Sequence, residues 1–213
     1  MDLYKILLVL IPVITAITLH EAAHGWVALK LGDSTAKDLG RITINPLKHI
    51  DLIGTVIIPI VMIVTTGFAF GYAKPVPVDV RNFEHPQKDM ALVALAGPLS
   101  NFVMAIFWTL LLGMSVKLLP HGDALNALKY MASVGIIINI VLMVVNLLPI
   151  LPLDGGRVLT GVLPFKWAVV FARTEKLGML LVILLLVTGI LGKILSPMVN
   201  LVQKQLFSLF GLG

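Results

Sequence analysis

The stretch His20-Glu21-Ala22-Ala23-His24 lies towards the end of the first long apolar run of the chain, Leu3 to Leu29. It has the form H-E-x-x-H, which places two imidazoles one helical turn apart on the same face, where they can share one Zn²⁺ ion. Glu21 then lies beside the water that such a metal activates, in position to take its proton. Ionisable groups are costly in hydrocarbon, so this cluster within an apolar run predicts a functional site.

The composition is that of a membrane protein. Of 213 residues, 58% are apolar and 13% are charged, and the mean hydropathy is +1.01. A soluble domain needs more charge on its surface, whereas runs of about 20 apolar residues match the hydrocarbon thickness of a bilayer. We therefore predict an all-α polytopic membrane protein of about four to five transmembrane helices. It is expected to form a single domain over residues 1–213.

The net charge and the absence of cysteine limit the partners and the metal ligands that are available to this chain. The net charge of +5 is small, and Lys and Arg in the loops of a membrane protein report its orientation, so no nucleic-acid partner is expected. The absence of cysteine excludes disulfides, a thiolate nucleophile and Cys-ligated zinc. His, Asp and Glu remain as metal ligands.

Apolar runs alternate along the chain with segments that are more polar or rich in proline. The runs are Leu3–Leu29, Leu52–Thr66, Met90–Leu119, Leu128–Ile150 and Gly178–Leu195. The last run belongs to an expected C-terminal helix over about 174–195, followed by an amphipathic tail, 197–213, that lies at the interface or crosses weakly. Leu39–Ile44 alternates like a short membrane-associated β segment, and two prolines favour an extended chain over Gly71–Val78.

A second unusual stretch, Asn146-Leu147-Leu148-Pro149-Ile150-Leu151-Pro152-Leu153-Asp154-Gly155-Gly156, follows the fourth run. Its prolines end a helix, and its glycine pair allows a tight turn around Asp154. That carboxylate either caps the helix that begins at Gly155 or supplies a third zinc ligand and leaves the fourth position to water. With His20 and His24 in the same chain, the ligand interpretation is the better one, and one residue could do both.

Other polar residues are open to two interpretations. Gly97-Pro98-Leu99-Ser100-Asn101 puts a small residue and an amide on one helix face, which suits either helix packing or a place near the site. Asn139 and Asn146 lie on one face of the fourth run, and interhelical hydrogen bonding is the default for Asn139. The remaining histidines lie in polar loops and are expected to face water: His49, His85 and His121.

Taken together, these motifs resemble those of the site-2 proteases, the intramembrane zinc metalloproteases. The two signatures are His20 to His24 and Asn146-x-x-Pro149-x-x-Pro152-Leu153-Asp154-Gly155. The intervening G-x-x-x-N feature is similar to Gly97 to Asn101, and Gly71–Val78 is similar to an extended segment of compact bacterial and archaeal members. The resemblance covers residues 3–165, and it is to members without a PDZ or CBS domain.

The resemblance implies roles for individual residues. His20, His24 and Asp154 would bind one Zn²⁺, and Glu21 would be the general base. Asn146 would hold or polarise the scissile peptide. Gly97, Asn101 and Gly155 would line the site or support its ligands. The implied partners are transmembrane helices of membrane-protein substrates within the lipid bilayer.

Bringing Asp154 to the two histidines constrains the topology. At about 1.5 Å per residue the His pair lies near the far end of the first helix, and Asp154 follows the end of the fourth run. Those ends coincide only if the two helices run parallel, so one of the two runs between them does not cross. Leu52–Thr66 is short and has Pro59 at its centre, which suits a re-entrant hairpin that lines the site.

The loop charges predict the orientation. With Leu52–Thr66 as a hairpin, Lys and Arg divide 11 to 5 in favour of the side that holds residues 30–89 and 151–176. The positive-inside rule places that side in the cytoplasm and the N-terminus outside. The active site then lies nearer the cytoplasmic face of a prokaryotic cell membrane.

We therefore expect an intramembrane zinc endopeptidase that hydrolyses peptide bonds within transmembrane segments, in regulated intramembrane proteolysis or in the clearance of membrane peptides. Two alternatives remain open. A membrane zinc transporter can also carry H-E-x-x-H on a helix, but it needs more crossings and further intramembrane histidines. A catalytically silent relative that binds membrane proteins would not require Glu21.

Overall fold

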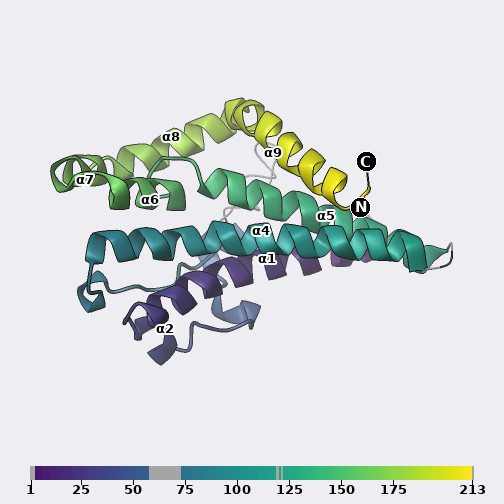
Figure 1. Ribbon diagram of the computed structural model, residues 1–213, viewed down its shortest axis with the longest axis horizontal. Helices are drawn as coiled ribbons and strands as arrows, with labels where there is room; N and C mark the ends of the chain where they lie inside the picture. Colours follow the sequence, from purple (N-terminus) through teal and green to yellow (C-terminus); the bar gives the residue numbers. More distant parts are fainter. Residues whose placement is uncertain (1–2, 58–72, 119, 121, 213) are drawn as a thin grey trace.

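The computed structural model describes residues 3–57, 73–118, 120 and 122–212, and all regular secondary structure in these residues is helical (Figure 1). The α-helices are α1 (Leu3–Lys30), α2 (Thr35–Asp38), α4 (Pro86–Leu118), α5 (Asp123–Asn146), α6 (Asp154–Val162), α7 (Phe165–Ala172), α8 (Glu175–Val187) and α9 (Ile190–Leu209). Shorter turns are the 3-10 helices η1 (Pro46–Lys48) and η3 (Val80–Asn82) and the π-helical turn η2 (Leu52–Ile57). The predicted all-α class is confirmed.

Three long helices, α1, α4 and α5, pack side by side and form the centre of the molecule (Figure 1). The Asn101 side chain in α4 reaches Ala16 in α1, whereas Val93, earlier in α4, reaches His24, later in α1, so the two helices are antiparallel. Asn101 also bonds Asn139 of α5, and Trp108 lies against Gly135, so α4 and α5 are antiparallel too. The helices that carry the two motifs, α1 and α5, therefore run parallel, as the sequence predicted.

The lengths and compositions of the helices make this a multi-pass membrane protein. Within the described residues, Tyr4–Lys30, Pro86–Lys117 and Asp123–Asn146 are each long and apolar enough to cross a bilayer. The pair α8 and α9 passes the same criterion only as one span bent by 83°. The described part of the chain thus holds three candidate crossings, or four if the bent pair counts as one.

The C-terminal region differs from the expected helix over 174–195 and tail from 197. The chain breaks earlier, because Gly189 adopts φ = 70°, a left-handed conformation that glycine reaches without steric cost and that ends α8. From Ile190 the chain continues as one helix through Pro197 to Leu209, so most of the expected tail belongs to α9. Leu191, Leu195 and Leu206 of α9 join the buried cluster formed by α4 and α5.

The segment between α1 and α4 leaves and returns at the same end of the bundle (Figure 1). The hairpin predicted over Leu52–Thr66 falls mostly outside the described residues; its described part, Leu52–Ile57, is the η2 turn.

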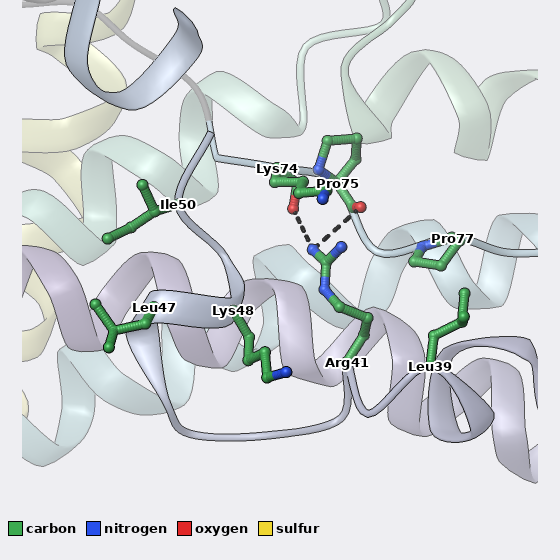
Figure 2. A pocket seen from close by; sticks show the side chains of 8 residues that line it. All are labelled: Leu39, Arg41, Leu47, Lys48, Ile50, Lys74, Pro75 and Pro77. Atoms are coloured by element: carbon green, nitrogen blue, oxygen red, sulfur yellow. Dashed lines mark hydrogen bonds between the residues drawn. The ribbon is translucent and has the colours of Figure 1, made fainter. Parts of the chain in front are cut away.

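The β segment predicted over Leu39–Ile44 is wrong, since these residues form a turn and bends, with Gly40 at φ = 62°. The Arg41 guanidinium instead donates to the carbonyls of Lys74 and Pro75, at 2.7 and 3.3 Å (Figure 2). Those are oxygens that a neighbouring strand would use, so Arg41 takes the place of a strand partner.

Candidate metal centre

The H-E-x-x-H motif lies in the C-terminal half of α1, where its two imidazoles face α4. His20 and His24 are 8% and 9% exposed, and their rings meet edge to face with centroids 4.7 Å apart. The motif is thus helical and its histidines share one buried face, as the spacing predicted.

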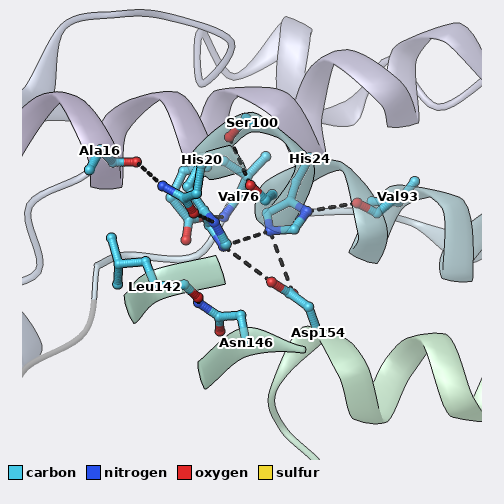
Figure 3. Close-up of polar contacts among 12 residues, drawn as sticks. Ala16, His20, His24, Val76, Val93, Ser100, Leu142, Asn146 and Asp154 are labelled. Atoms are coloured by element: carbon cyan, nitrogen blue, oxygen red, sulfur yellow. Dashed lines mark hydrogen bonds and ion pairs between the residues drawn. The ribbon is translucent and has the colours of Figure 1, made fainter. Parts of the chain in front are cut away.

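Asp154 is brought to the same place by the turn that follows α5. It is the first residue of α6, and its carboxylate oxygens lie 3.2 Å from Nε2 of His20 and 3.5 Å from Nε2 of His24 (Figure 3). The residue at the cap position is Leu153, and no side chain caps this helix. Of the two interpretations left open for Asp154, the structure therefore favours the place beside the histidines.

The turn itself needs glycine after Asp154. A Cβ on Gly155 would lie 2.3 Å from the Leu147 carbonyl oxygen, and a Cβ on Gly156 would lie 2.5 Å from the Leu151 nitrogen. Both contacts are with backbone, which cannot move aside like the end of a side chain. Gly155 acts on the site through this close packing, because it lets α6 begin directly under the end of α5.

The protonation of the two histidine rings follows from their partners. Nδ1 of His20 lies 2.6 Å from Oδ1 of Asn101, and Nδ1 of His24 lies 2.7 Å from the Val93 carbonyl oxygen (Figure 3). Both oxygens accept hydrogen bonds only, so each Nδ1 carries a proton and donates it. In the neutral rings each Nε2 is then a bare lone pair, and the two Nε2 atoms lie 3.1 Å apart.

These groups fit a zinc ion. Two imidazole lone pairs and a carboxylate converge, and their ligand atoms all lie within 4.8 Å of one another. Oδ2 of Asp154 is buried and has no hydrogen-bond donor among the described residues. Three acceptors facing each other repel unless a cation lies between them, and two His with one carboxylate is a common ligand set of catalytic zinc, which keeps a fourth position open.

The site has no room for a side chain at Gly97 of α4. A Cβ there would lie 2.5 Å from Nε2 and Cε1 of His24 and 2.5 Å from Cε1 of His20. The position of Gly97 is compatible with both interpretations of the Gly97–Asn101 feature, because the glycine lets α4 approach α1 and lies against both imidazole rings.

Glu21 lies on the neighbouring face of α1 and contacts the loop segment before α4. Its Oε2 accepts a hydrogen bond from the Val76 backbone N–H at 2.9 Å. Pro75 and Pro77 flank this N–H and have none of their own, so Val76 is the one donor of the three. Arg41 donates to the carbonyls of Lys74 and Pro75, so the segment that holds the Glu21 carboxylate is itself held by the loop after α2.

Asn146, at the last position of α5, is half-buried and turned towards its own helix. Its Nδ2 donates to the Leu142 carbonyl oxygen at 3.0 Å (Figure 3). Of the remaining histidines, the two in the described part of the chain do not join the site. His49 was expected to face water but is 3% exposed, with Nε2 3.0 Å from the Thr43 carbonyl oxygen, His85 is exposed, and His121 lies outside the described residues.

Three features of the site were not foreseen from the sequence: the Val93 carbonyl, the Val76 N–H and the identity of Asn101 as the partner of Asn139, whose interhelical hydrogen bonding was predicted and is confirmed. The first two are backbone groups, which every residue carries and which leave no trace in a sequence pattern. Asn139 did leave one, as a second intramembrane amide on the face of Asn146.

The fold and the site together define a helical membrane protein in which two buried histidines and a half-buried aspartate converge as candidate metal ligands. The model of peptidase family M50 matches residues 114–189, which include Asp154. "Putative zinc metalloprotease YwhC" of Bacillus subtilis (strain 168) is 36% identical over 207 residues, covering 94% of this chain and 89% of the relative. "Putative zinc metalloprotease Rip2" of Mycolicibacterium smegmatis is 29% identical over 189 residues, covering 88% and 69%. No solved structure gives a significant match.

The chain belongs to peptidase family M50, the site-2 protease family, and is a membrane zinc protease. The resemblance seen in the motifs is thereby confirmed.

Proposed function

We propose that this protein is an intramembrane endopeptidase that uses one zinc ion to hydrolyse peptide bonds within transmembrane segments. One observation carries the proposal: two of the three converging metal ligands, His20 and His24, belong to a helix that is long and apolar enough to cross a bilayer. Ionisable groups at membrane depth are retained where they function, and here they form one buried cluster.

His20, His24 and Asp154 would hold the ion, with the ligand atoms already within 4.8 Å of one another. When bound, zinc supplies Lewis-acid polarisation of the scissile carbonyl and lowers the pKa of water. Because Nδ1 of each histidine is occupied by a hydrogen bond to Asn101 or Val93, both rings are held with Nε2 towards the site.

Glu21 would act as the general base and then as the general acid. Its carboxylate takes a proton from the attacking water and delivers it to the nitrogen of the leaving amine. The Val76 N–H holds Oε2, which leaves Oε1 for the proton. A fixed carboxylate needs no reorientation at the moment of attack, which is the benefit of such positioning.

Asn146 would bind the scissile peptide. Its amide now bonds the Leu142 carbonyl, so binding a substrate requires rotation of this side chain away from its own helix. The segment Lys74–Val78 contacts Glu21 through the Val76 N–H, and we propose that it pairs with an unwound stretch of substrate by strand addition, through the backbone groups that Arg41 and Glu21 do not already engage. A transmembrane helix must unwind locally before attack, because its carbonyls are engaged in hydrogen bonds within the helix.

The proposal also includes the orientation of the protein in the membrane. The end of the bundle that holds the loop between α1 and α4 also holds α6 and α7, and it carries the larger share of Lys and Arg, 11 against 5. This end would face the cytoplasm of a prokaryotic cell, with the N-terminus outside the cell membrane.

The experiment that tests the function compares wild type with Glu21→Gln, purified in the same detergent and given the same single-pass substrates. Gln keeps the size and the hydrogen bond from Val76 but cannot take a proton. We expect wild type to cleave within the transmembrane segment and Glu21→Gln to be inactive while binding one zinc per chain. Equal cleavage by both proteins would refute the protease mechanism. Zinc uptake into vesicles without cleavage would favour a transporter, and substrate binding without cleavage by either protein would favour a silent relative.

A further inference from the structure

We propose that Asn139 is a positioning residue of the metal centre, which holds the first histidine ligand in its metal-binding tautomer through Asn101. The inference rests on the proposed zinc site at His20, His24 and Asp154. The side-chain hydrogen bonds of Asn139 go to Gly135 and to Asn101, and neither of these is a proposed ligand. Asn139 acts on His20 from α5, across α4.

The hydrogen bonds form one directed chain. Nδ2 of Asn139 donates to the Gly135 carbonyl oxygen at 2.8 Å, and Oδ1 of Asn139 accepts from Nδ2 of Asn101 at 2.9 Å. Oδ1 of Asn101 then accepts from Nδ1 of His20 at 2.6 Å. Since a backbone carbonyl can only accept, it fixes the orientation of the Asn139 amide, and each later bond inherits its direction from the one before.

The consequence for His20 is specific. As long as Asn101 turns its oxygen to the ring, the proton of the imidazole stays on Nδ1 and Nε2 keeps the lone pair that a metal needs. If the Asn101 amide turned over, its NH₂ group would face Nδ1, and the ring proton would move to Nε2, where it blocks the metal. The other support for the present orientation is the longer bond to the Ala16 carbonyl oxygen, at 3.2 Å.

Because these amides are buried, losing one bond of the chain leaves its partner unpaired. Asn101 and Asn139 are both 0% exposed, so water cannot replace a lost partner. Thr109 and Ser115 in α4, 0% and 3% exposed, bond only their own helix, at the carbonyls of Ala105 and Leu112. Asn139 differs because its amide connects two helices and ends at a metal ligand.

The test uses the full-length protein and two readouts besides activity: the dissociation constant of Zn²⁺ against a chromophoric chelator, and the absorption spectrum of bound Co²⁺. Asn139→Leu removes the acceptor at similar size. Asn139→Asp keeps it, because a buried carboxyl stays protonated and offers one O–H to Gly135 and one oxygen to Asn101. Thr109→Val is the matched control, since it removes a polar group of equal burial outside the chain of bonds.

We expect Asn139→Leu to weaken zinc binding by about tenfold to a hundredfold and to change the cobalt spectrum. Asn139→Asp and Thr109→Val should bind zinc like the wild type. A folded Asn139→Leu protein with wild-type affinity and spectrum would overturn the proposal, as would an equal loss in Thr109→Val. If Asn139→Leu does not fold, Asn139→Asp decides the question: a folded Asn139→Asp protein that binds zinc weakly would also overturn the proposal. His20→Ala distinguishes failure of the Asn139 proposal from failure of the zinc site on which it rests, because full zinc binding without His20 would refute the metal site itself.

Discussion

Nε2 of His20 and Nε2 of His24 lie 3.1 Å apart, and the hydrogen bonds at their Nδ1 atoms leave both as acceptors. Two lone pairs at this distance, with the Asp154 carboxylate beside them, attract a cation and repel each other without one. The relationship explains why three groups that are costly at membrane depth occur together, and it leads directly to a prediction about metal removal.

Removing the metal should destabilise the protein. A ligand that binds only the folded state at about 100 times its dissociation constant adds about 2.7 kcal/mol to the free energy of unfolding. We therefore expect a chelator to lower the thermal unfolding midpoint of the detergent-solubilised protein and added zinc to restore it. His20→Ala should show the same midpoint with and without chelator, and a chelator effect of wild-type size in that variant would contradict the site.

Gly97→Ala should weaken zinc binding at the site. The added Cβ would lie 2.5 Å from His24 Nε2, so at least one imidazole must move away from its ligand position. We expect zinc affinity to fall by about tenfold or more, and proteolysis with it.

The control for this substitution is Gly113→Ala in the same helix. There the nearest atom to the new Cβ is a Leu212 methyl at 3.7 Å, an ordinary contact. Equal zinc affinity in the two alanine variants would mean that the close approach of Gly97 to the imidazole rings is not required.

Val76→Pro should lower catalysis without releasing the metal. It deletes the N–H that holds Glu21, in a segment where both neighbours are already proline. A hydrogen bond to a charged group contributes about 1.5–3 kcal/mol, so kcat should fall by about 10- to 100-fold. Val76→Ala removes the side chain and keeps the N–H, and zinc content is measured in both. A kcat that falls equally in the alanine variant would assign the effect to packing.

The loop before α4 should be sensitive to acid through Asp33, which lies beyond the end of α1. Burial raises the pKa of its carboxyl, but hydrogen bonds from Thr35, Asn82 and the Asp79 backbone outweigh burial and lower the pKa below 3.8. The folded state thus favours the ionised form. The stabilisation is complete above the unfolded pKa and is lost as the pH falls through the lower, folded value.

Asp33→Asn measures this contribution. The amide would turn a donor towards one of the N–H groups that Asp33 now accepts, which costs about 1–3 kcal/mol at neutral pH. We expect the stability difference between wild type and Asp33→Asn, followed by thermal unfolding, to shrink as the pH is lowered towards the folded pKa. A difference that does not change with pH would show that the charge of Asp33 contributes nothing.

Orientation is tested with single cysteines, which the natural chain lacks. We expect a membrane-impermeant thiol reagent applied to intact cells to label Asp2→Cys and Asp123→Cys but not Glu84→Cys. Glu84 and Asp123 are exposed, so their substitution disturbs no packing. Labelling at position 84 and protection at position 2 would reverse the proposed topology.

Most of the elements that could be predicted depend on residues that are close together in the sequence. The helix of His20 and His24 follows from a spacing of four residues, and the long helices follow from runs of apolar side chains. The parallel course of α1 and α5 followed from requiring Asp154 at the His pair, which is a geometric condition on known chain lengths. The bend at Gly189 was missed because a glycine within an apolar run is compatible with both a continuous helix and a break.

By itself the sequence determined the membrane class and the family, and it singled out the candidate metal ligands and general base, since these depend on residue type and on spacing within two short motifs. Only the tertiary structure decided how the ligands are held. The Val93 carbonyl, the Val76 N–H and the Asn139 amide come from segments far apart in the chain, and two of them are backbone groups without a sequence signature. The orientation of an imidazole depends on which donor or acceptor packing brings to its second nitrogen.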